Sequence, residues 1–370
     1  MSSELKGIPS GRVVSIDALR GFDMFWIFMW ASFFKRLFNK LDGSFFNFLY
    51  GQLFHSKWHG FTFYDFIFPL FMFIVGLSMS YSFGKRIQRG EVGKKLYIHI
   101  IKRTLTLILL GLVYNGLFDF DFADLRYTGV LQRIAICYLF TALILLYTNI
   151  RTQVIITGLL LLIYWGAMAL IPVPGYGVGV LTPEGNLAGY IDRLLVPGKL
   201  CCYKFGDHEG ILATIPAVAS TMIGLLTGHW LHTSNTVNKK LKYMIGAGLL
   251  LIITGLIWNF VFPFNKILWT SSYVVYAGGW SLLLFCLFYW IIDVKGYKKW
   301  AFPFIVIGLN PLTIFVVQRI FDFGIISDIF IHGFVDYFGS YSDIFRSFCV
   351  LLTQWLFLYF LYKKKIFLKA

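Results

Sequence analysis

The sequence predicts an all-α, polytopic membrane protein with about ten transmembrane helices in a single domain, residues 1–370. Three observations support this fold class. Of the residues, 58% are hydrophobic and only 14% are charged, and the mean hydropathy is +0.71. A soluble domain is nearer half apolar and a quarter charged, and its core could not bury this much apolar surface. The apolar residues also gather in long blocks, and most Lys and Arg residues lie between them.

Each apolar block is long enough to cross a hydrocarbon core of about 30 Å, which takes roughly 18–23 residues of helix. In chain order we place the spans at Ile16–Phe34, Thr62–Phe83, Tyr97–Phe118, Gly129–Tyr147, Val154–Ile171, Ile211–Leu231, Leu241–Phe260, Ser271–Ile292, Phe302–Phe321 and Ile344–Tyr362.

The charges between the blocks predict the orientation in the membrane. With these spans, the four basic clusters fall on the side of the N-terminus: Lys85–Arg103, Lys239–Lys242, Lys295–Lys299 and Lys363–Lys369. Cytoplasmic loops carry an excess of Lys and Arg, so we expect both termini to be cytoplasmic. The formal net charge of +15 is therefore interpreted as a topology signal, with no nucleic-acid partner. Residues 1–12 contain no apolar region, so we expect no cleavable signal peptide.

The longest external segment, Pro172–Gly210, is rich in Gly and Pro. It is too long for a tight turn, so we expect a lid or a wall of an external site. It contains Cys201 and Cys202, and a bridge between neighbouring cysteines is strained. We therefore expect no disulfide framework, and the five cysteines fit no metal spacing.

Two histidines and an aspartate, His55, His59 and Asp65, lie at the predicted external mouth of the second span. Because a histidine titrates near neutrality, it can take a proton from an amine or hydroxyl nucleophile. Asp65 could orient such a base, as a carboxylate does in a catalytic triad. A lone interfacial histidine usually only forms hydrogen bonds, but the clustering of these residues with Trp58 favours a functional site. We expect no metal, because the two histidines lack a third ligand nearby.

Charged groups also lie at the ends of other spans, where they are costly and therefore functional candidates. Arg133, with Gln132 beside it, falls just inside the external end of the fourth span and must meet an anion or a carboxylate.

At the cytoplasmic ends, Arg20, Lys102 and Arg103 could together attract an anionic ligand. Two simpler interpretations stay open. Asp17 and Arg20 are three residues apart on a helix, so they could form an interfacial ion pair. Lys102 and Arg103 could be ordinary cytoplasmic anchors.

Carboxylates and aromatic rings before the sixth and eighth spans suit the binding of a polar sugar. Asp207 and Glu209 open the sixth span from outside, and Trp269 precedes the eighth. Helix capping and an aromatic belt at the membrane surface would explain the same residues equally well.

Taken together, these segments resemble the heparan-alpha-glucosaminide N-acetyltransferase family, part of a broad group of transmembrane acyltransferases. The resemblance covers nearly the whole chain in order, on the motifs Ser15–Gly21, His55–Gly60, Asp65–Pro69, Gly129–Arg133, Ile171–Gly175, Gly189–Leu195, Glu209–Thr214, Asn265–Trp269, Asp293–Gly296 and Lys364–Phe367.

The resemblance implies transfer of an acetyl group from cytoplasmic acetyl-CoA to the amine of a glucosamine-type sugar on the far side of the membrane. The active-site histidine of the family carries over to His55, which would be the general base or a transiently acetylated nucleophile. Asp65 would orient it, and Gln132 and Arg133 would lie near the acyl or pantetheine end.

The remaining expectations follow from the resemblance to this acetyltransferase family. Arg20, Lys102 and Arg103 would attract the phosphates of CoA. The acceptor site would be lined by Trp58, Asp207, Glu209 and Trp269. The bacterial relatives imply an inner-membrane location, and a homodimer stays open. Some bacterial relatives are described as amino-sugar transport proteins, so an amino-sugar transporter is the alternative function.

Overall fold

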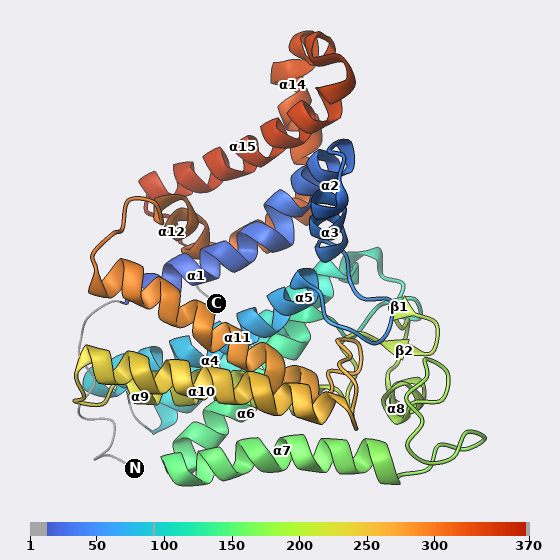
Figure 1. Ribbon diagram of the computed structural model, residues 1–370, viewed down its shortest axis with the longest axis vertical. Helices are drawn as coiled ribbons and strands as arrows, with labels where there is room; N and C mark the ends of the chain where they lie inside the picture. Colours follow the sequence, from blue (N-terminus) through green and yellow to red (C-terminus); the bar gives the residue numbers. More distant parts are fainter. Residues whose placement is uncertain (1–12, 92, 368–370) are drawn as a thin grey trace. The chain divides into compact units, whose positions relative to one another are not determined.

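The computed structural model describes residues 13–91 and 93–367 (Figure 1). Three parts of the sequence predictions lie outside these residues: the absence of a signal peptide in residues 1–12, residue 92 of the first basic cluster, and residues 368–369 at the end of the last one. The predicted all-α class is confirmed, because the regular secondary structure of the described residues is helical apart from one hairpin of two two-residue strands and two isolated bridges.

The α-helices are α1 Val14–Met24, α2 Ala31–Lys40, α3 Ser44–Gln52, α4 Phe63–Gln88, α5 Lys94–Tyr114, α6 Val130–Tyr147, α7 Ile150–Leu170, α8 Leu187–Leu195, α9 Thr214–Leu231, α10 Val237–Asn259, α11 Ser271–Tyr289, α12 Phe302–Gly308, α13 Pro311–Ile320, α14 Phe323–Val335 and α15 Ser342–Lys363. The π-helical segments are Phe25–Trp30 and Trp290–Val294, the 3-10 segments are Leu117–Asp119 and Asp336–Tyr341, and the strands are β1 Cys202–Tyr203 and β2 Gly206–Asp207.

By length and composition, 7 helices of the described chain can cross a membrane, or 8 if one bent pair counts as a span. The predicted number of about ten is therefore approximate. The two other predicted spans are also helical: Ile16–Phe34 falls on α1, a π-helical turn and α2, and Ile211–Leu231 falls on α9. The π-helical turn divides the first of these into two short helices.

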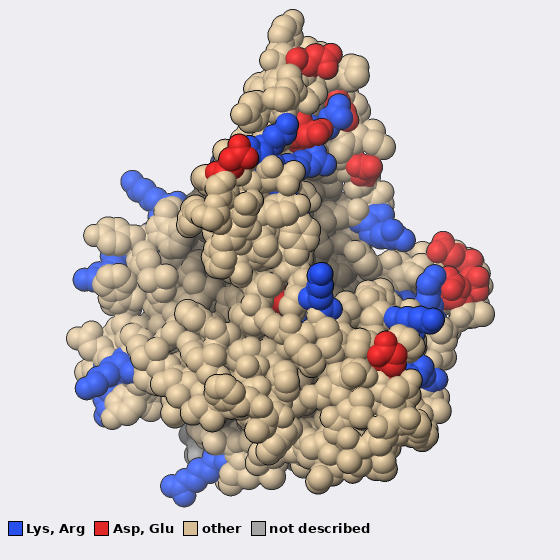
Figure 2. Space-filling model, turned by 45° about the vertical axis from the view of Figure 1, so that its right-hand side comes forward, with Lys and Arg blue, Asp and Glu red and all other residues tan. Residues whose placement is uncertain are grey.

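Apolar side chains cover the outward faces of several helices, as lipid contact requires. The candidate span α10 has only 17% of its most apolar stretch buried, and Leu249, Leu250 and Ile253 are exposed on it. On the face drawn in Figure 2, the charged side chains gather mainly near the top and at the edges of the view, and the surface between them is largely uncharged. This surface is the one expected of a protein solvated by lipid.

The described chain divides into two compact units. The larger unit consists of Ser56–Phe61 and Pro69–Cys286. Within it α9 packs against α6, α7 and α10, and α5 packs against α6. The segment predicted as an external lid or wall adds α8 and the hairpin of β1 and β2, and α8 packs against α7 and β2. This segment brings its polar side chains onto the same unit as α6 and α9.

Glycines let two helices of the larger unit touch backbone to backbone. A Cβ atom on Gly76 of α4 would lie 1.8 Å from the carbonyl oxygen of Thr221 on α9, and one on Gly224 would lie 1.9 Å from that of Phe73. Membrane helices use small residues in this way, because close approach maximises van der Waals contact. Neither glycine can therefore be enlarged without separating α4 from α9.

The smaller unit consists of Val13–His55, Thr62–Phe68 and the chain from Leu287 onward. Its centre is the pair α1 and α12, and α15 packs against α2, α12 and α14. The pair crosses at Gly21 and Gly308, where a Cβ on Gly308 would lie 1.9 Å from the carbonyl oxygen of Asp17.

The structure changes two predicted elements of the smaller unit. The predicted span Phe302–Phe321 is broken into α12 and α13, which are bent by 71° at residues 309–310. Pro311 explains the break, since proline lacks the N–H that would continue the helix and fits only its first turn. The predicted spans leave residues 322–343 as a connection between two of them, but residues 323–335 of it form α14, with Asp322 as the N-cap.

Candidate functional site

The imidazole of His55 and the carboxylate of Asp65 form a pair within the smaller unit. His55 Nδ1 lies 2.8 Å from Asp65 Oδ1. The side chain of Asp65 is fully buried, whereas that of His55 is 44% exposed. A carboxylate bound at Nδ1 favours the tautomer with its proton on that nitrogen, so Nε2 is the atom that can accept a proton. The pairing expected from the sequence is therefore present in this geometry.

Thr62 fixes the carboxylate by a capping box at the start of α4. The backbone N–H of Thr62 donates to Asp65 Oδ2 at 3.2 Å, and that of Asp65 donates to Thr62 Oγ1 at 3.3 Å. This reciprocal pattern satisfies two N–H groups that a helix start would otherwise leave unpaired. One oxygen of Asp65 thus caps the helix and the other contacts His55. The sequence Thr62-Phe-Tyr-Asp65 before an apolar run carries this signal, which the sequence analysis missed.

Arg20 forms an ion pair with Asp17 in the smaller unit. Its Nη1 lies 3.3 Å from Asp17 Oδ1 and 3.4 Å from the carbonyl oxygen of Gly308. The ion pair of the simpler sequence interpretation is therefore present, and its position at the membrane interface stays a prediction. The side chain of Arg20 is 22% exposed.

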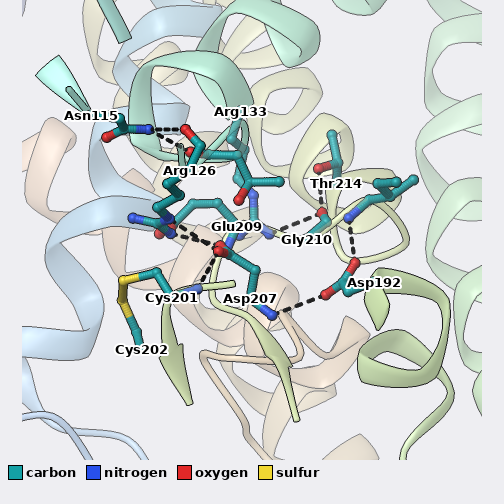
Figure 3. A network of polar contacts seen from close by, with 12 residues as sticks. Asn115, Arg126, Arg133, Asp192, Cys201, Cys202, Asp207, Glu209, Gly210 and Thr214 are labelled. Atoms are coloured by element: carbon teal, nitrogen blue, oxygen red, sulfur yellow. Dashed lines mark hydrogen bonds and ion pairs between the residues drawn. A yellow bond between two sulfur atoms is a disulfide. The ribbon is translucent and has the colours of Figure 1, made fainter. Parts of the chain in front are cut away.

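In the larger unit, Arg126 binds both carboxylates that the sequence assigned to an acceptor site (Figure 3). Its Nη2 donates to Asp207 Oδ1 at 2.6 Å and its Nε to Asp207 Oδ2 at 3.0 Å, and Nη2 also contacts Glu209. Arg126 was not predicted as a site residue. Its position three residues before the Gly129–Arg133 motif was the only signal available.

Asp207 is occupied on both oxygens. Besides Arg126, it accepts the backbone N–H of Cys201 at 2.8 Å and that of Glu209 at 2.8 Å. Burial by itself would raise the pKa of Asp207, but the hydrogen bonds and charge of Arg126 outweigh it, so the pKa is lower than usual. Asp207 is therefore a buried anion whose contacts hold the external segment together.

A second carboxylate, Asp192 of α8, fastens the same segment. It accepts the backbone N–H of Asp207 at 3.2 Å and that of Ile211 at 2.9 Å (Figure 3). A Cβ on Gly210 would lie 2.0 Å from Asp192 Oδ2, so only glycine fits there. Burial raises the pKa of Asp192.

The adjacent cysteines Cys201 and Cys202 are joined by a disulfide, contrary to the sequence expectation (Figure 3). The backbone explains how neighbours can meet: Cys202 has a positive φ of 83°. The other cysteines, Cys137, Cys286 and Cys349, form no disulfide.

Arg133 is buried inside the larger unit, and some of its N–H groups have no hydrogen-bond partner among the described residues. Only 1% of it is exposed, its guanidinium lies 4.9 Å from the ring centroid of Trp269, and Nη2 lies 3.4 Å from the carbonyl oxygen of Gly210. Its Nε and Nη1, and Nε2 of Gln132, have no hydrogen-bond partner among the described residues. Trp269 is 1% exposed and donates from Nε1 to Ser220, so it supports Arg133 and does not face an open surface.

The two neighbouring cations of α5 have different surroundings. Lys102 is exposed and lines a shallow groove of about 410 Å³ with other, mostly apolar residues of the same helix. Arg103 instead lies 4.5 Å from the ring of Tyr138 on α6. The structure therefore does not bring these cations together.

Trp58 and His59 belong to the larger unit, unlike His55. Trp58 donates from Nε1 to the carbonyl oxygen of Leu181 at 2.7 Å, and its ring lies 5.5 Å from that of Tyr203. Burial lowers the pKa of His59, and a backbone contact with Phe264 opposes that shift. The external segment thus packs against Trp58.

The predicted site residues fall into separate groups. His55, Asp65 and Arg20 lie in the smaller unit, and the others lie in the larger unit, where Asp207 and Glu209 meet at Arg126 and Arg133 meets Trp269. Among residues 13–91 and 93–367, no group of three His, Cys, Asp or Glu side chains could hold a metal ion.

Comparison with known proteins gives the chain a family. The family model described as "Heparan-alpha-glucosaminide N-acetyltransferase, catalytic" matches residues 12–255, more than half of the chain. Heparan-alpha-glucosaminide N-acetyltransferase of Homo sapiens is 28% identical over 380 residues, covering 85% of this chain and 55% of the human protein. The Mus musculus protein of the same name is 28% identical over 381 residues, covering 85% of this chain and 56% of the mouse protein.

The chain spans about half the length of these relatives. The matched region contains the His55–Asp65 pair and Arg133. It also contains Arg126 with its partners Asp207 and Glu209, which we call the Arg126 cluster. The chain belongs to the heparan-alpha-glucosaminide N-acetyltransferase family, by its match to the catalytic region of that family.

Proposed function

We propose that the protein is a transmembrane acetyltransferase that moves an acetyl group from cytoplasmic acetyl-CoA to the amine of a glucosamine-type sugar on the other side of the membrane. The observation that carries the proposal is the His55–Asp65 pair, a half-exposed imidazole held by a buried carboxylate. Family membership supports the reaction class. Two further parts belong to the same proposal. The cytoplasmic position of both termini rests on the distribution of Lys and Arg, and localisation in a bacterial inner membrane rests on the resemblance to bacterial relatives.

In the proposed reaction, His55 acts as a general base. The sugar amine attacks the carbonyl carbon of the thioester while Nε2 of His55 takes a proton from the nitrogen. The carbonyl electron pair moves to oxygen and then returns, which breaks the C–S bond. The departing CoA sulfur takes the proton from the imidazolium. Asp65 holds the ring and stabilises its charged form, as in catalytic triads.

A second route uses the same residues in another order. His55 Nε2 attacks the thioester first, and the C–S bond breaks to release CoA as the thiolate, which leaves the acetyl group on a positively charged imidazole ring. The amine then attacks this acetyl group, the bond to Nε2 breaks, and the proton lost by the amine passes to the CoA thiolate. The contact between Nδ1 and Asp65 serves both routes, because each passes through a positively charged or acylated ring. Trapping an acetylated His55 distinguishes them.

For the donor we propose two groups of residues. Arg20, Lys102 and Arg103 do not form one cluster in the structure; each adds positive charge that attracts the CoA phosphates at the cytoplasmic side. Arg133 and Gln132 lie at the acyl or pantetheine end, since their N–H groups without partners among the described residues can donate to amide and thioester carbonyls.

For the acceptor we propose that Trp58, Asp207, Glu209 and Trp269 form or support the sugar site. The contacts suggest different roles for them. Trp58 and Glu209 are partly exposed and can contact a sugar, whereas Asp207 and Trp269 are buried and act by holding Arg126 and Arg133 in position.

The test uses purified protein in detergent with acetyl-CoA and glucosamine or a glucosaminide. Without a sealed compartment no transport can occur, so formation of N-acetyl product isolates the chemistry. Saturable sugar uptake into proteoliposomes, with no acetylated product in detergent, would instead establish the amino-sugar transporter. Family membership favours the enzyme.

A further inference from the structure

Lys35 of α2 is a cation beside the His55–Asp65 pair. Its Nζ lies 4.3 Å from the centroid of the Phe54 ring and 5.0 Å from that of Tyr64. The Tyr64 ring lies 4.6 Å from the imidazole of His55 at an interplanar angle of 37°. All of these residues belong to the smaller unit. The ammonium is therefore one aromatic ring away from the imidazole.

The surroundings of Lys35 leave its positive charge uncompensated. Within the part of the chain that the structure describes, Lys35 makes no ion pair and no hydrogen bond, and its ammonium lies over the two rings. Its neighbour Arg36 instead donates to the carbonyl oxygen of Asp343 at 3.0 Å. Ring faces attract a cation without neutralising it. Burial also lowers the pKa of Lys35, as expected for a desolvated ammonium with no anion beside it.

The proposed reaction creates a negative charge that a cation close to His55 can stabilise. When the amine has attacked the thioester, the site holds the carboxylate of Asp65, a protonated His55 and a negative oxygen on the former carbonyl. The first two charges cancel, so the oxygen is left as the uncompensated charge. A partly desolvated cation opposite such an oxygen lowers the barrier, because it interacts more strongly with the intermediate than with the neutral thioester.

We propose that Lys35 is a further catalytic residue, whose ammonium stabilises the oxyanion formed on the acetyl carbonyl during transfer. This inference rests on the proposed function of the His55 site. In the step concerned, the amine nitrogen forms a bond to the carbonyl carbon, the C=O π pair becomes the third lone pair of the oxygen next to Lys35, and His55 takes the amine proton. Collapse re-forms the C=O bond, expels the CoA sulfur and returns the proton to it.

The rings of Phe54 and Tyr64 have a defined part in this arrangement. They hold the ammonium at a fixed position without giving it a counter-ion, which a carboxylate in their place would do. The Phe54 carbonyl also accepts the hydroxyl of Thr62 at 2.7 Å, so the residue that carries the first ring is bonded to the capping box of α4. Lys35 is thus positioned through the same segment as Asp65.

The experiment compares Lys35→Met and Lys35→Arg with a matched control, Arg36→Met, which removes one positive charge from the adjacent residue of the same helix. For each purified variant, kcat and KM are measured for acetyl transfer, and CoA binding and melting temperature report folding. Removing one group that stabilises an oxyanion costs about 10²–10³ in kcat, so we expect this loss in Lys35→Met. KM and CoA binding should change little. Lys35→Arg keeps the charge and should recover most of the lost rate.

Every outcome bears on the inference. If Lys35→Met keeps kcat within about threefold of wild type, or raises KM alone, Lys35 does not stabilise the oxyanion. Equal losses in Lys35→Met, Lys35→Arg and Arg36→Met would indicate a structural effect and also overturn it. Should the wild type transfer no acetyl group at all, the proposed function fails and this inference fails with it. Should the wild type be active and His55→Ala inactive, a normal rate in Lys35→Met refutes the role of Lys35 alone.

Discussion

Arg126 binds Asp207 through two nitrogens, with Nη2 at 2.6 Å from Oδ1 and Nε at 3.0 Å from Oδ2 (Figure 3). The two residues are 81 positions apart in the sequence. Their contact joins the loop before α6 to the external segment before α9. The two-pronged geometry fixes the orientation as well as the distance of the partners.

Asp207→Asn should destabilise the protein by about 3–5 kcal/mol, because it leaves the guanidinium of Arg126 partly buried with only Glu209 as counter-ion. Thermal unfolding in detergent would measure the change, and faster tryptic cleavage at Lys199 or Lys204 would locate it. Asp124→Asn is the matched control, since its ion pair with Lys199 is exposed and should contribute at most about 1 kcal/mol. Equal melting temperatures for the two variants would contradict a stabilising role for the buried pair.

Lowering the pH should reduce the stabilisation that the Arg126 cluster gives the fold. The folded pKa of Asp207 is lowered from its usual 3.8, so its contribution to stability is present above that value and is lost as the pH falls through the folded pKa. Asp192 acts in the opposite sense, because burial raises its pKa and protonation then favours the folded form. As the pH is lowered below about 4, the melting temperature of the wild type should therefore fall more steeply than that of Asp207→Asn. Both proteins keep Asp192, so its opposite contribution is the same in each. Parallel curves would refute this linkage.

His55→Ala should lose at least about two orders of magnitude in acetyl transfer, the usual contribution of general-base catalysis. The variant should still fold and bind CoA, because the His55 side chain is 44% exposed. His59→Ala is the control and should lose much less, since burial lowers the pKa of His59 and no carboxylate among the described residues pairs with it. Near-native turnover by His55→Ala would remove His55 from the mechanism. A labelled acetyl group that forms on wild type and not on His55→Ala would assign it as the nucleophile.

Asp65→Asn and Thr62→Val separate the two roles of the capping box. Asn keeps an oxygen for the Thr62 N–H but loses the charge that holds the imidazole, so we expect a loss of up to about 10⁴ in kcat with little change in stability. Thr62→Val keeps the carboxylate and removes the cap, at a cost of about 0.5–2 kcal/mol in stability and a smaller loss in kcat. Steady-state rates and thermal melts of both variants provide the check. The reverse ranking in kcat would show that the charge of Asp65 is unimportant.

Cysteine labelling tests the orientation in the membrane. The loop between α4 and α5 is predicted to be cytoplasmic, so Arg89→Cys should be protected from an impermeant thiol reagent in intact cells, and Asp121→Cys in the opposite loop should react. Cys137 and Cys286 are buried, so only Cys349 needs replacement to remove the background from unbonded cysteines. Labelling of Arg89→Cys and protection of Asp121→Cys in sealed cells would invert the topology.

The sequence predicts the helices well because lipid imposes a simple rule on their length and polarity. It predicts their interruptions poorly. The π-helical turn at Phe25–Trp30 and the bend before Pro311 arise from packing and from local backbone geometry, which leave the apolar pattern unchanged. The helix α14 was missed because Asp322 and Asp336 at its two ends and Asp328 within it made residues 322–336 resemble an external loop.

The candidate site was predictable where its residues are close in the sequence. His55 and Asp65 are ten residues apart, and their pairing follows from chemistry and chain length. Arg126 and Lys35 were missed because their partners, Asp207 and the Tyr64 ring, are distant in sequence. A pattern of residues shows that a charge is present, but not which ring or carboxylate the fold brings to it.

The capping box at the start of α4 ties the proposed activity to one turn of helix. Thr62 and Asp65 bond to each other only while that turn is formed, and the same bonds aim the second carboxylate oxygen at His55. Helix ends open more readily than helix centres. Fraying of this single turn would release the imidazole while the transmembrane helices stay intact. The upper working temperature of the protein would then be set by the first turn of α4, below the temperature at which the fold itself melts.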